Sequence, residues 1–168
     1  MQKISFIAAL SENRVLGADN QLIWHLPADW ENFKRVTQGG AFIMGRKSYV
    51  SKDMLYSDHL NVVLSRSPQK ELPEGFVAAS TTEQALALLK DEPEVFVLGG
   101  GEIFRQLLPM ANYMYLTIVH HHFEGDAFFP EIRWADWELV KSRRVEVDEQ
   151  HAYAFSLNEY ARRAPAAL

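Results

Sequence analysis

The sequence predicts an α/β fold in which helices cover both faces of a largely parallel β-sheet. Short apolar runs typical of buried strands alternate along the chain with segments of helical pattern, which favours parallel strands joined by helical crossovers. The length of 168 residues, with 48% hydrophobic and 23% charged side chains, fits one ordinary globular domain. We expect this domain to span residues 1–163, with a short tail at residues 164–168.

The first half of the chain is expected to contain one long helix and four strands. Pro27 suits the first position of a helix and Asp29 lies near the positive end of the helix dipole, so a helix is predicted over residues 27–36. The Gly39-Gly40 pair ends it. The polar segment 11–21 predicts a loop. Apolar runs predict strands at residues 4–10, 41–44, 60–64 and 75–79.

The second half adds two helices and four strands. Thr81 or Thr82 can N-cap an amphipathic helix that runs to Lys90, and a helix at residues 102–108 follows the strand at 95–98. The other strands are expected at residues 113–119, 137–147 and 152–161, the last two as a long antiparallel pair. Ligands of parallel sheets bind beyond the carboxyl ends of the strands, so the site is expected just after Leu10, Met44, Leu64, Leu98 and Val119.

Composition and charge exclude several classes of protein. The absence of cysteine excludes disulfides, iron–sulfur clusters, Cys-ligated zinc and thiol nucleophiles. A net charge of −5 argues against a nucleic-acid partner. No apolar run reaches the roughly 18 residues of a membrane-spanning helix, and the N-terminal apolar stretch is too short for a signal peptide. We therefore expect a cytoplasmic protein without a membrane partner.

Three consecutive glycines, Gly99 to Gly101, follow an apolar strand and precede a helix. Glycines let the backbone approach a ligand closely, and the first turn of a helix offers unpaired N–H groups to a phosphate or pyrophosphate. A plain tight turn would use the same residues. The pattern therefore favours a phosphate site without establishing one.

Basic and hydroxyl side chains follow two of the predicted strands. Arg46, Lys47 and Ser48 come after the strand at 41–44, where Ser48 is expected to cap a short helix, and Ser65 and Arg66 come after the strand at 60–64. The guanidinium fork of arginine suits a phosphate monoester. Two basic strand ends beside a glycine turn indicate NADP(H) rather than NAD. The alternative is that both arginines are ordinary solvated charges.

Asp29 stands among aromatic and apolar residues that include Trp24, Trp30 and Phe33. Residues three and four positions apart share a face of a helix, so Asp29 and Phe33 are expected to lie close together. A carboxylate against aromatic walls can hold a cationic or amidine-like heterocycle, and desolvation would change its proton affinity. The alternative is an acidic residue that interacts favourably with the helix dipole.

The run His120-His121-His122 permits a metal site, because His120 and His122 face the same side of a strand. No third ligand follows at a suitable spacing, and a catalytic zinc site uses three protein ligands. We therefore expect a structural or solvent-facing role and no bound metal.

These motifs occur together in an order that resembles the bacterial dihydrofolate reductase family. The segments are ISFIAAL, NRVLG, W-x-LPAD-x-x-x-FK, MGRKS, LGGGEIF, YLT and EGD-x-x-FP, from Ile4 to about Tyr160. The resemblance implies a three-layer α/β/α fold with an eight-stranded, mostly parallel mixed sheet, an antiparallel C-terminal strand and four helices. It also implies hydride transfer from NADPH to C6 of dihydrofolate with protonation of N5, which gives tetrahydrofolate for one-carbon and thymidylate metabolism. Antifolate inhibitors and a monomeric state are expected on the same basis.

The resemblance assigns the catalytic and substrate-binding positions. Asp29 matches the carboxylate that hydrogen-bonds the amidine edge of the pterin and promotes protonation of N5, the proton being delivered by water. Thr117 matches the threonine that supports this carboxylate, Trp24 the tryptophan that orders water, and Leu22 the end of a mobile loop that closes over the nicotinamide and is steadied by Gly125 and Asp126. The remaining substrate-binding positions are Ile7, Ala9, Trp30, Phe33, Lys34, Lys52, Tyr56, His59 and Leu98.

The resemblance also assigns the cofactor-binding positions, which come from the mobile loop, the strand ends and the glycine turn with its helix. These positions are Ala9, Leu16, Gly17, Asn20, Leu22, Gly45, Arg46, Lys47, Ser48, Leu64, Ser65, Arg66, Leu98, Gly99, Gly100, Gly101, Glu102, Ile103, Phe104 and Gln106.

Three positions depart from the family pattern. His59 stands where the family has an arginine that pairs with the α-carboxylate of the substrate's glutamate, Ile23 where many bacterial members have proline, and Phe104 where a tyrosine is frequent. Histidine lacks the guanidinium fork and is only partly charged near neutral pH, so we expect weaker folate binding that improves at lower pH. Two other functions stay open: a related pterin or pyrimidine reductase whose substrate has no glutamate tail, and a catalytically silent NADP- or folate-binding homologue.

Overall fold

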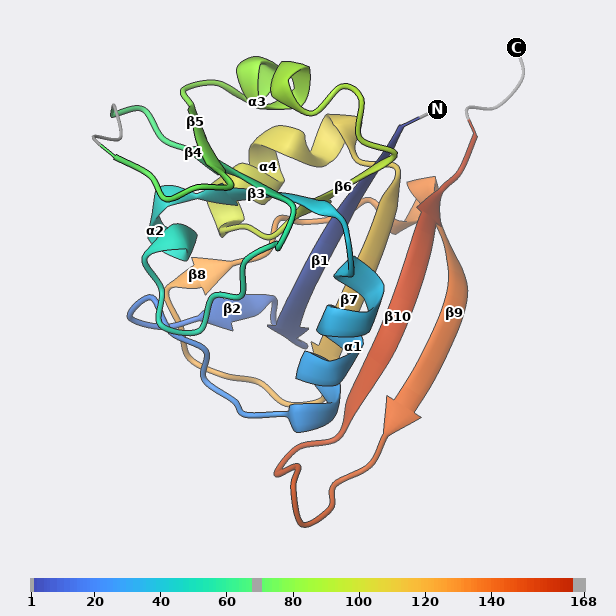
Figure 1. Cartoon of the computed structure of the whole chain (residues 1–168). Helices are drawn as coiled ribbons and strands as arrows, with labels where there is room; N and C mark the ends of the chain where they lie inside the picture. Colours follow the sequence, from blue (N-terminus) through green and yellow to red (C-terminus); the bar gives the residue numbers. More distant parts are fainter. Residues whose placement is uncertain (1, 68–70, 165–168) are drawn as a thin grey trace.

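An eight-stranded sheet forms the centre of the molecule in a computed structural model that describes residues 2–67 and 71–164 (Figure 1). Its strand order is β5-β4-β3-β6-β1-β7-β10-β9. The strands are β1 (Lys3–Ser11), β3 (Ala41–Gly45), β4 (Leu60–Leu64), β5 (Phe76–Ala79), β6 (Glu94–Val97), β7 (Tyr113–Val119), β9 (Trp137–Val145) and β10 (Phe155–Arg162). Neighbours from β5 to β7 pair in parallel, and β10 runs antiparallel to both β7 and β9. The predicted sheet is confirmed. Of the expected tail at 164–168, only residue 164 lies within the described residues.

Within the described residues, four α-helices form two outer layers, one on each face of the sheet (Figure 1). They are α1 (Pro27–Thr37), α2 (Arg46–Tyr49), α3 (Thr82–Leu88) and α4 (Gly101–Leu107). A short 3₁₀ turn at Leu108–Met110 follows α4, and another at Trp134–Asp136 precedes β9. Phe33 of α1 and Tyr49 of α2 pack on one face against buried Phe42 and Met44. On the other face, Ala85 of α3 and Phe104 of α4 pack into a larger cluster around Phe6. The three-layer arrangement therefore agrees with the prediction.

The local signals for the helices were mostly sufficient to place them. The helix α1 begins at Pro27, and Thr81 caps α3 because its Oγ1 accepts a hydrogen bond from the Gln84 amide at 3.0 Å. The prediction for the short helix was wrong, because α2 begins at Arg46 with Gly45 at the N-cap and no side-chain cap. Ser48 is therefore a residue within α2. The polar residues after β3 begin this helix directly, because Arg46 follows the last residue of the strand.

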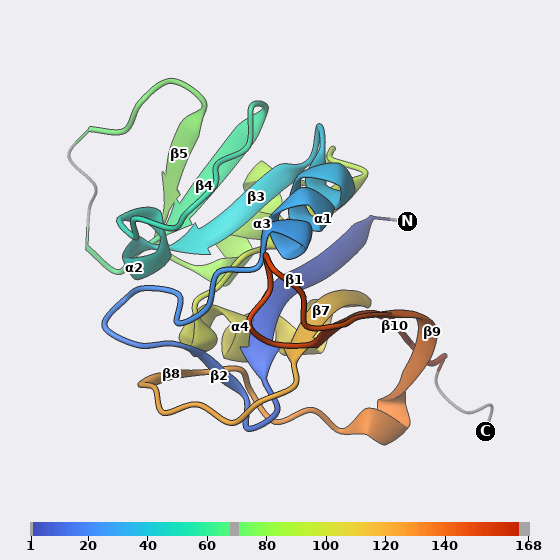
Figure 2. The same ribbon diagram turned by 90° about the horizontal axis from the view of Figure 1, so that it is seen from below.

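The predicted loop at 11–21 contains a short strand that the sequence did not indicate. This strand, β2 (Val15–Gly17), pairs antiparallel with β8 (Ala127–Phe128) beyond the end of β1 (Figure 2). Each strand is too short to show an alternating pattern, and their partners lie far apart in the sequence. The small sheet connects the segment after β1 to the segment after β7, and both segments border the site described below.

Gly101 is required by close packing of α4 against β8. A Cβ atom at this position would lie 2.4 Å from the Phe128 carbonyl oxygen, so backbone would have to move. We expect Gly101→Ala to lower the free energy of unfolding by about 1–3 kcal/mol, the usual cost of overpacking. Thermal denaturation followed by circular dichroism would measure it. Arg105→Ala, an exposed change on the same helix, should cost less than about 0.5 kcal/mol, and an equal loss in both variants would contradict the packing argument.

Candidate functional site

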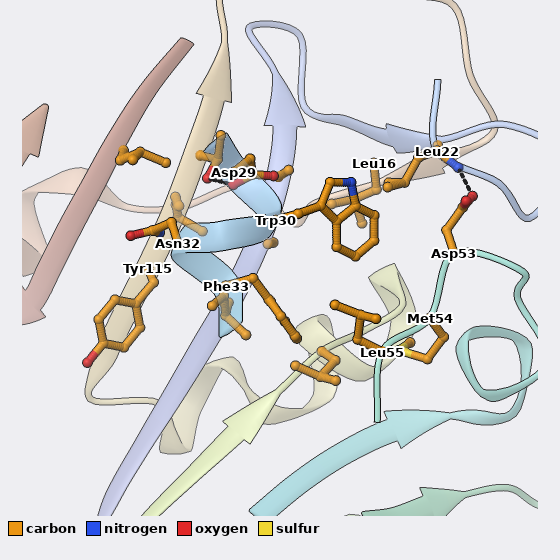
Figure 3. A pocket seen from close by; sticks show the side chains of 18 of the residues that line it. Leu16, Leu22, Asp29, Trp30, Asn32, Phe33, Asp53, Met54, Leu55 and Tyr115 are labelled. Carbon is orange, nitrogen blue, oxygen red and sulfur yellow. Dashed lines mark hydrogen bonds between the residues drawn. The ribbon is translucent and has the colours of Figure 1, made fainter. Parts of the chain in front are cut away.

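A cavity of about 320 Å³ opens beyond the carboxyl ends of β1 and β6 and extends around α1 (Figure 3). Its walls come from α1, from β1 and β7, from the loop after β2 and from the segment that follows α2. Many of the residues predicted for substrate or cofactor meet here: Ile7, Ala9, Leu16, Gly17, Asn20, Leu22, Asp29, Trp30, Phe33, Leu98, Gly100, Phe104 and Thr117 all line the cavity.

The first turn of α1 places a carboxylate in this cavity. Asp29 is partly buried, and the Thr117 hydroxyl of β7 donates a hydrogen bond of 2.6 Å to its Oδ1. Burial raises the pKa of Asp29 from 3.8 to about 6, and the hydrogen bond from Thr117 opposes part of that rise. The side chain can therefore exchange a proton close to neutral pH.

Trp30 and Phe33 give one side of the cavity an aromatic wall, at 6.5 Å between ring centroids. In Figure 3 both side chains point from α1 toward Leu16 and Leu55. A flat heterocycle could lie in this half and present polar edges to Asp29, because the rest of its surroundings is largely apolar.

The other side of α1 is more polar than the sequence indicated. Asn32 and Tyr115 point away from Trp30 there (Figure 3), and the lining continues over Arg35, Lys141, Arg143, Leu157, Asn158 and Glu159. Asn32 and Arg35 could have been predicted as lining residues from the sequence, because they lie one and two turns after Asp29 on the same helix. The residues of β9 and β10 could not, because their position depends on strand pairing that carries no local signal.

Four predicted substrate residues do not line the cavity. Lys34 and Lys52 are exposed. The hydroxyl of Tyr56 donates a hydrogen bond of 2.5 Å to the Tyr49 carbonyl oxygen. His59 is held outside the cavity by Glu92, with 2.6 Å between its Nε2 and Glu92 Oε1. From the segment between α2 and β4, the residues that line the cavity include Met54 and Leu55 instead.

Trp24 also lies outside the cavity lining, although it is close to it in sequence and fold. Its indole packs against Phe123 with ring centroids 5.2 Å apart. Its buried Nε1 has no hydrogen-bond partner among the described residues. Buried polar groups are normally paired with protein or water, so this N–H is suited to bind a water molecule.

The glycine turn lies beside the carboxyl end of β3. The Gly45 amide donates a hydrogen bond of 2.7 Å to the Gly99 carbonyl oxygen, and Gly99 has a φ of 109°, which favours glycine. A Cβ atom at Gly100 would approach nothing nearer than Ser48 Oγ, at 3.8 Å. The surface above Gly100 is therefore open, and the residues that begin α2 lie next to it.

Charged side chains surround this turn. Arg46 and Lys47 are exposed at the start of α2. On α4, hydrogen bonds from Arg105 and Gln106 lower the pKa of Glu102 to about 2, with a smaller contribution from the charge of Arg66. The positive charge of Arg66 therefore acts on the first turn of α4. Three other predicted cofactor residues lie on neighbouring elements. Leu64 ends β4, Ser65 follows it directly, and Ile103 belongs to α4.

The loop at residues 17–22, called the cleft loop below, is tied to both of its neighbours. The Asp19 amide donates a hydrogen bond of 3.1 Å to Asp126 Oδ2, and the Asp126 amide donates one of the same length to the Gly17 carbonyl oxygen. On the opposite side, the Asn20 side chain donates to the Lys47 carbonyl oxygen at 2.9 Å. The cleft loop therefore connects the β8 segment to the start of α2.

The histidine run gives no metal centre among the residues that the structure describes, where no group of three or more ligating side chains occurs. His120 Nε2 lies 2.7 Å from Ser156 Oγ and its Nδ1 lies 3.4 Å from Glu12 Oε2. Within the same described residues, no helix is long and apolar enough to cross a membrane.

Comparisons with known proteins agree with this geometry. The family model described as dihydrofolate reductase matches residues 3–162. The dihydrofolate reductase of Bacillus subtilis is 38% identical over 160 residues, which cover 95% of each chain. That of Haemophilus influenzae is 40% identical over 149 residues, 89% of this chain and 92% of its own. The structure of the Enterococcus faecalis enzyme in complex with NADP(H) and RAB-propyl superposes with a TM-score of 0.86 at 32% identity, and covers 96% of this chain and 97% of that one.

The match therefore extends over nearly the whole chain in sequence and in structure, and the reaction of this family is the NADPH-dependent reduction of dihydrofolate to tetrahydrofolate. The chain belongs to the dihydrofolate reductase family.

Proposed function

We propose that this chain reduces 7,8-dihydrofolate to 5,6,7,8-tetrahydrofolate with NADPH, using Asp29 of α1 as the carboxylate that binds the pterin. The observation that carries the proposal is the hydrogen bond of 2.6 Å from Thr117 to Asp29 at the end of an apolar, aromatic-walled cavity. This arrangement suits the amidine edge of a pterin, which can donate two parallel hydrogen bonds to a carboxylate.

The residues around the glycine turn fit the cofactor. The open surface above Gly100 leaves room for a pyrophosphate against the backbone, and Arg46, Lys47 and Arg66 supply positive charge beside it. When bound, NADPH supplies the hydride. Leu22 of the cleft loop and Leu16 of β2 line the same cavity, where they would exclude water from the reacting carbons.

Asp29 and Trp24 would control the proton. With a pKa of about 6, Asp29 keeps a protonated fraction at neutral pH, and its hydrogen bonds would favour the form of the pterin that takes up a proton at N5. The unpaired Nε1 of Trp24 is suited to hold the water that delivers that proton. We also propose that the chain acts as a monomer in the cytoplasm, as the family resemblance and the sequence lead us to expect.

NADPH oxidation by the purified chain in the presence of dihydrofolate tests the proposal. We expect turnover that depends on both compounds and a lower rate with a 7,8-dihydropterin that lacks the benzoylglutamate tail. Intact NADPH binding without turnover of either substrate would contradict the proposal and favour a silent binding protein. Faster turnover of the dihydropterin would favour the related reductase, for which the position of His59 outside the cavity is the supporting observation.

His59→Arg tests how the tail is recognised. An arginine at this position could pair with a carboxylate through two hydrogen bonds, so we expect the KM for dihydrofolate to fall about tenfold with little change in kcat. The KM for the dihydropterin should stay the same. His25→Arg, which adds the same group at an exposed position, should change neither value. An unchanged KM for dihydrofolate in His59→Arg would show that residue 59 does not contact the tail.

A further inference from the structure

On the side that faces α2, the cleft loop is contacted by a short turn as well as by Lys47. This turn comprises Ser51, Lys52 and Asp53, and the Met54 amide closes it with a hydrogen bond of 3.3 Å to the Ser51 carbonyl oxygen. The Ser51 hydroxyl donates to the Asn20 carbonyl oxygen at 2.9 Å. Asp53 Oδ2 accepts a hydrogen bond of 2.8 Å from the Leu22 amide (Figure 3). Two side chains of one turn therefore contact two positions of the loop.

The two contacts differ in what they fix. Ser51 contacts Asn20, which is at the tip of the loop and is also bound to the Lys47 carbonyl oxygen. Asp53 contacts Leu22, where the chain turns back toward α1 and the side chain lines the cavity. A carboxylate that accepts from an amide makes a stronger hydrogen bond than a neutral acceptor. Asp53 therefore restrains the part of the loop that faces the reacting groups.

The orientation of Asp53 is set by its own turn. Its amide donates to Ser51 Oγ at 3.3 Å, so the side chain that contacts Asn20 also orients the residue that contacts Leu22. Directly after Asp53, Met54 and Leu55 form the wall of the cavity opposite the cleft loop. A substrate ring that packs on Met54 and Leu55 would thus contact the segment that holds Leu22.

We propose that Asp53 is a positioning residue that holds Leu22 over the cavity and links closure of the cleft loop to the wall on which substrate packs. The inference rests on the proposed function only where it concerns the effect of loop closure on dihydrofolate reduction. The hydrogen bond itself can be measured in the absence of any ligand. Its removal should let the loop open more often, so the cofactor and the closed geometry would be retained less well.

Asp53→Ala tests this directly, with Asp53→Asn as the conservative variant because its amide oxygen can still accept from Leu22. The first measurement is the amide proton shift and hydrogen-exchange protection of Leu22 by NMR without ligand. We expect about tenfold faster exchange in Asp53→Ala and near wild-type exchange in Asp53→Asn. The second is NADPH affinity by fluorescence titration, where we expect about tenfold weaker binding in Asp53→Ala and substantial recovery in Asp53→Asn.

Asp58→Ala is the matched control, because it removes an exposed carboxylate from the same segment between α2 and β4. It should leave Leu22 exchange and NADPH affinity unchanged. Unchanged Leu22 exchange in Asp53→Ala would overturn the proposal, and so would faster exchange with unaltered NADPH affinity. If the wild-type chain bound NADPH but did not reduce dihydrofolate, the proposed function would fail, and the exchange and binding measurements would still decide the role of Asp53.

Discussion

Asp29→Asn should lower kcat/KM for dihydrofolate by about 10²- to 10⁴-fold, the range that removal of a general acid–base group usually gives. The side chain keeps its size and can still accept the hydrogen bond from Thr117, so the cavity should keep its shape. It can no longer become ionised or carry an exchangeable acid proton. We expect NADPH affinity to change little, because the cofactor residues lie around the glycine turn. Steady-state kinetics with NADPH titration would measure both effects.

The same substitution should make the protein more stable above pH 6. The folded pKa of Asp29 is about 6, against 3.8 for an unperturbed aspartate, so the folded state binds more protons than the unfolded state between these values. Its stability therefore falls as pH rises through this window and stays lower above it. Asparagine has no ionisation to suppress, and we expect a gain of about 1–3 kcal/mol at pH values near 8.

Urea denaturation at about pH 4 and pH 8 would measure that gain. It should be present at the higher pH and nearly absent at the lower one, where the carboxyl is protonated in the fold. Asp58→Asn, at an exposed position, should show neither the gain nor its pH dependence. Equal stability of Asp29→Asn and wild type at both pH values would show that burial of Asp29 does not strain the fold. An unchanged kcat/KM in folded Asp29→Asn would contradict the proton role.

Arg46→Ala should weaken NADPH by about 10- to 100-fold and NADH by much less. Arg46 is exposed immediately after Gly45, whose amide is bound to the Gly99 carbonyl oxygen, so its backbone lies beside the glycine turn. The two cofactors differ by one phosphate monoester, and a charged hydrogen-bonded pair contributes about 1.5–3 kcal/mol. The ratio of the two dissociation constants, measured by fluorescence titration, reports that contact alone.

A matched change elsewhere separates this contact from a general effect of charge. Lys90→Ala removes one exposed cation from the end of the segment after α3, and it should leave the NADPH to NADH ratio unchanged. Equal weakening of both cofactors by Arg46→Ala would show that Arg46 does not read the additional phosphate, and would leave Arg66 as the stronger candidate.

Much of the fold could be predicted because its signals are local. The apolar runs of the central strands and Pro27 at the start of α1 placed most elements, whereas β2 and β8 are too short to form a pattern and depend on each other. Asp29 could be found because a carboxylate among aromatic residues is unusual. Asp53 could not, because its contact with Leu22 exists only after the loop and the turn have packed.

The sheet also determines when the site can form during folding. The first strand of the chain, β1, lies between β6 and β7, with Ser5 paired to Phe96 on one side and to Tyr113 on the other. The centre of the sheet therefore closes only after loops of about a hundred residues have been ordered, which is typical of slowly folding topologies. On a ribosome, β1 would wait for most of the chain, and Asp29 would meet Thr117 only once β7 had emerged. The chain thus spends most of its synthesis with this central, largely apolar strand unpaired, the stage at which chaperones would act on it.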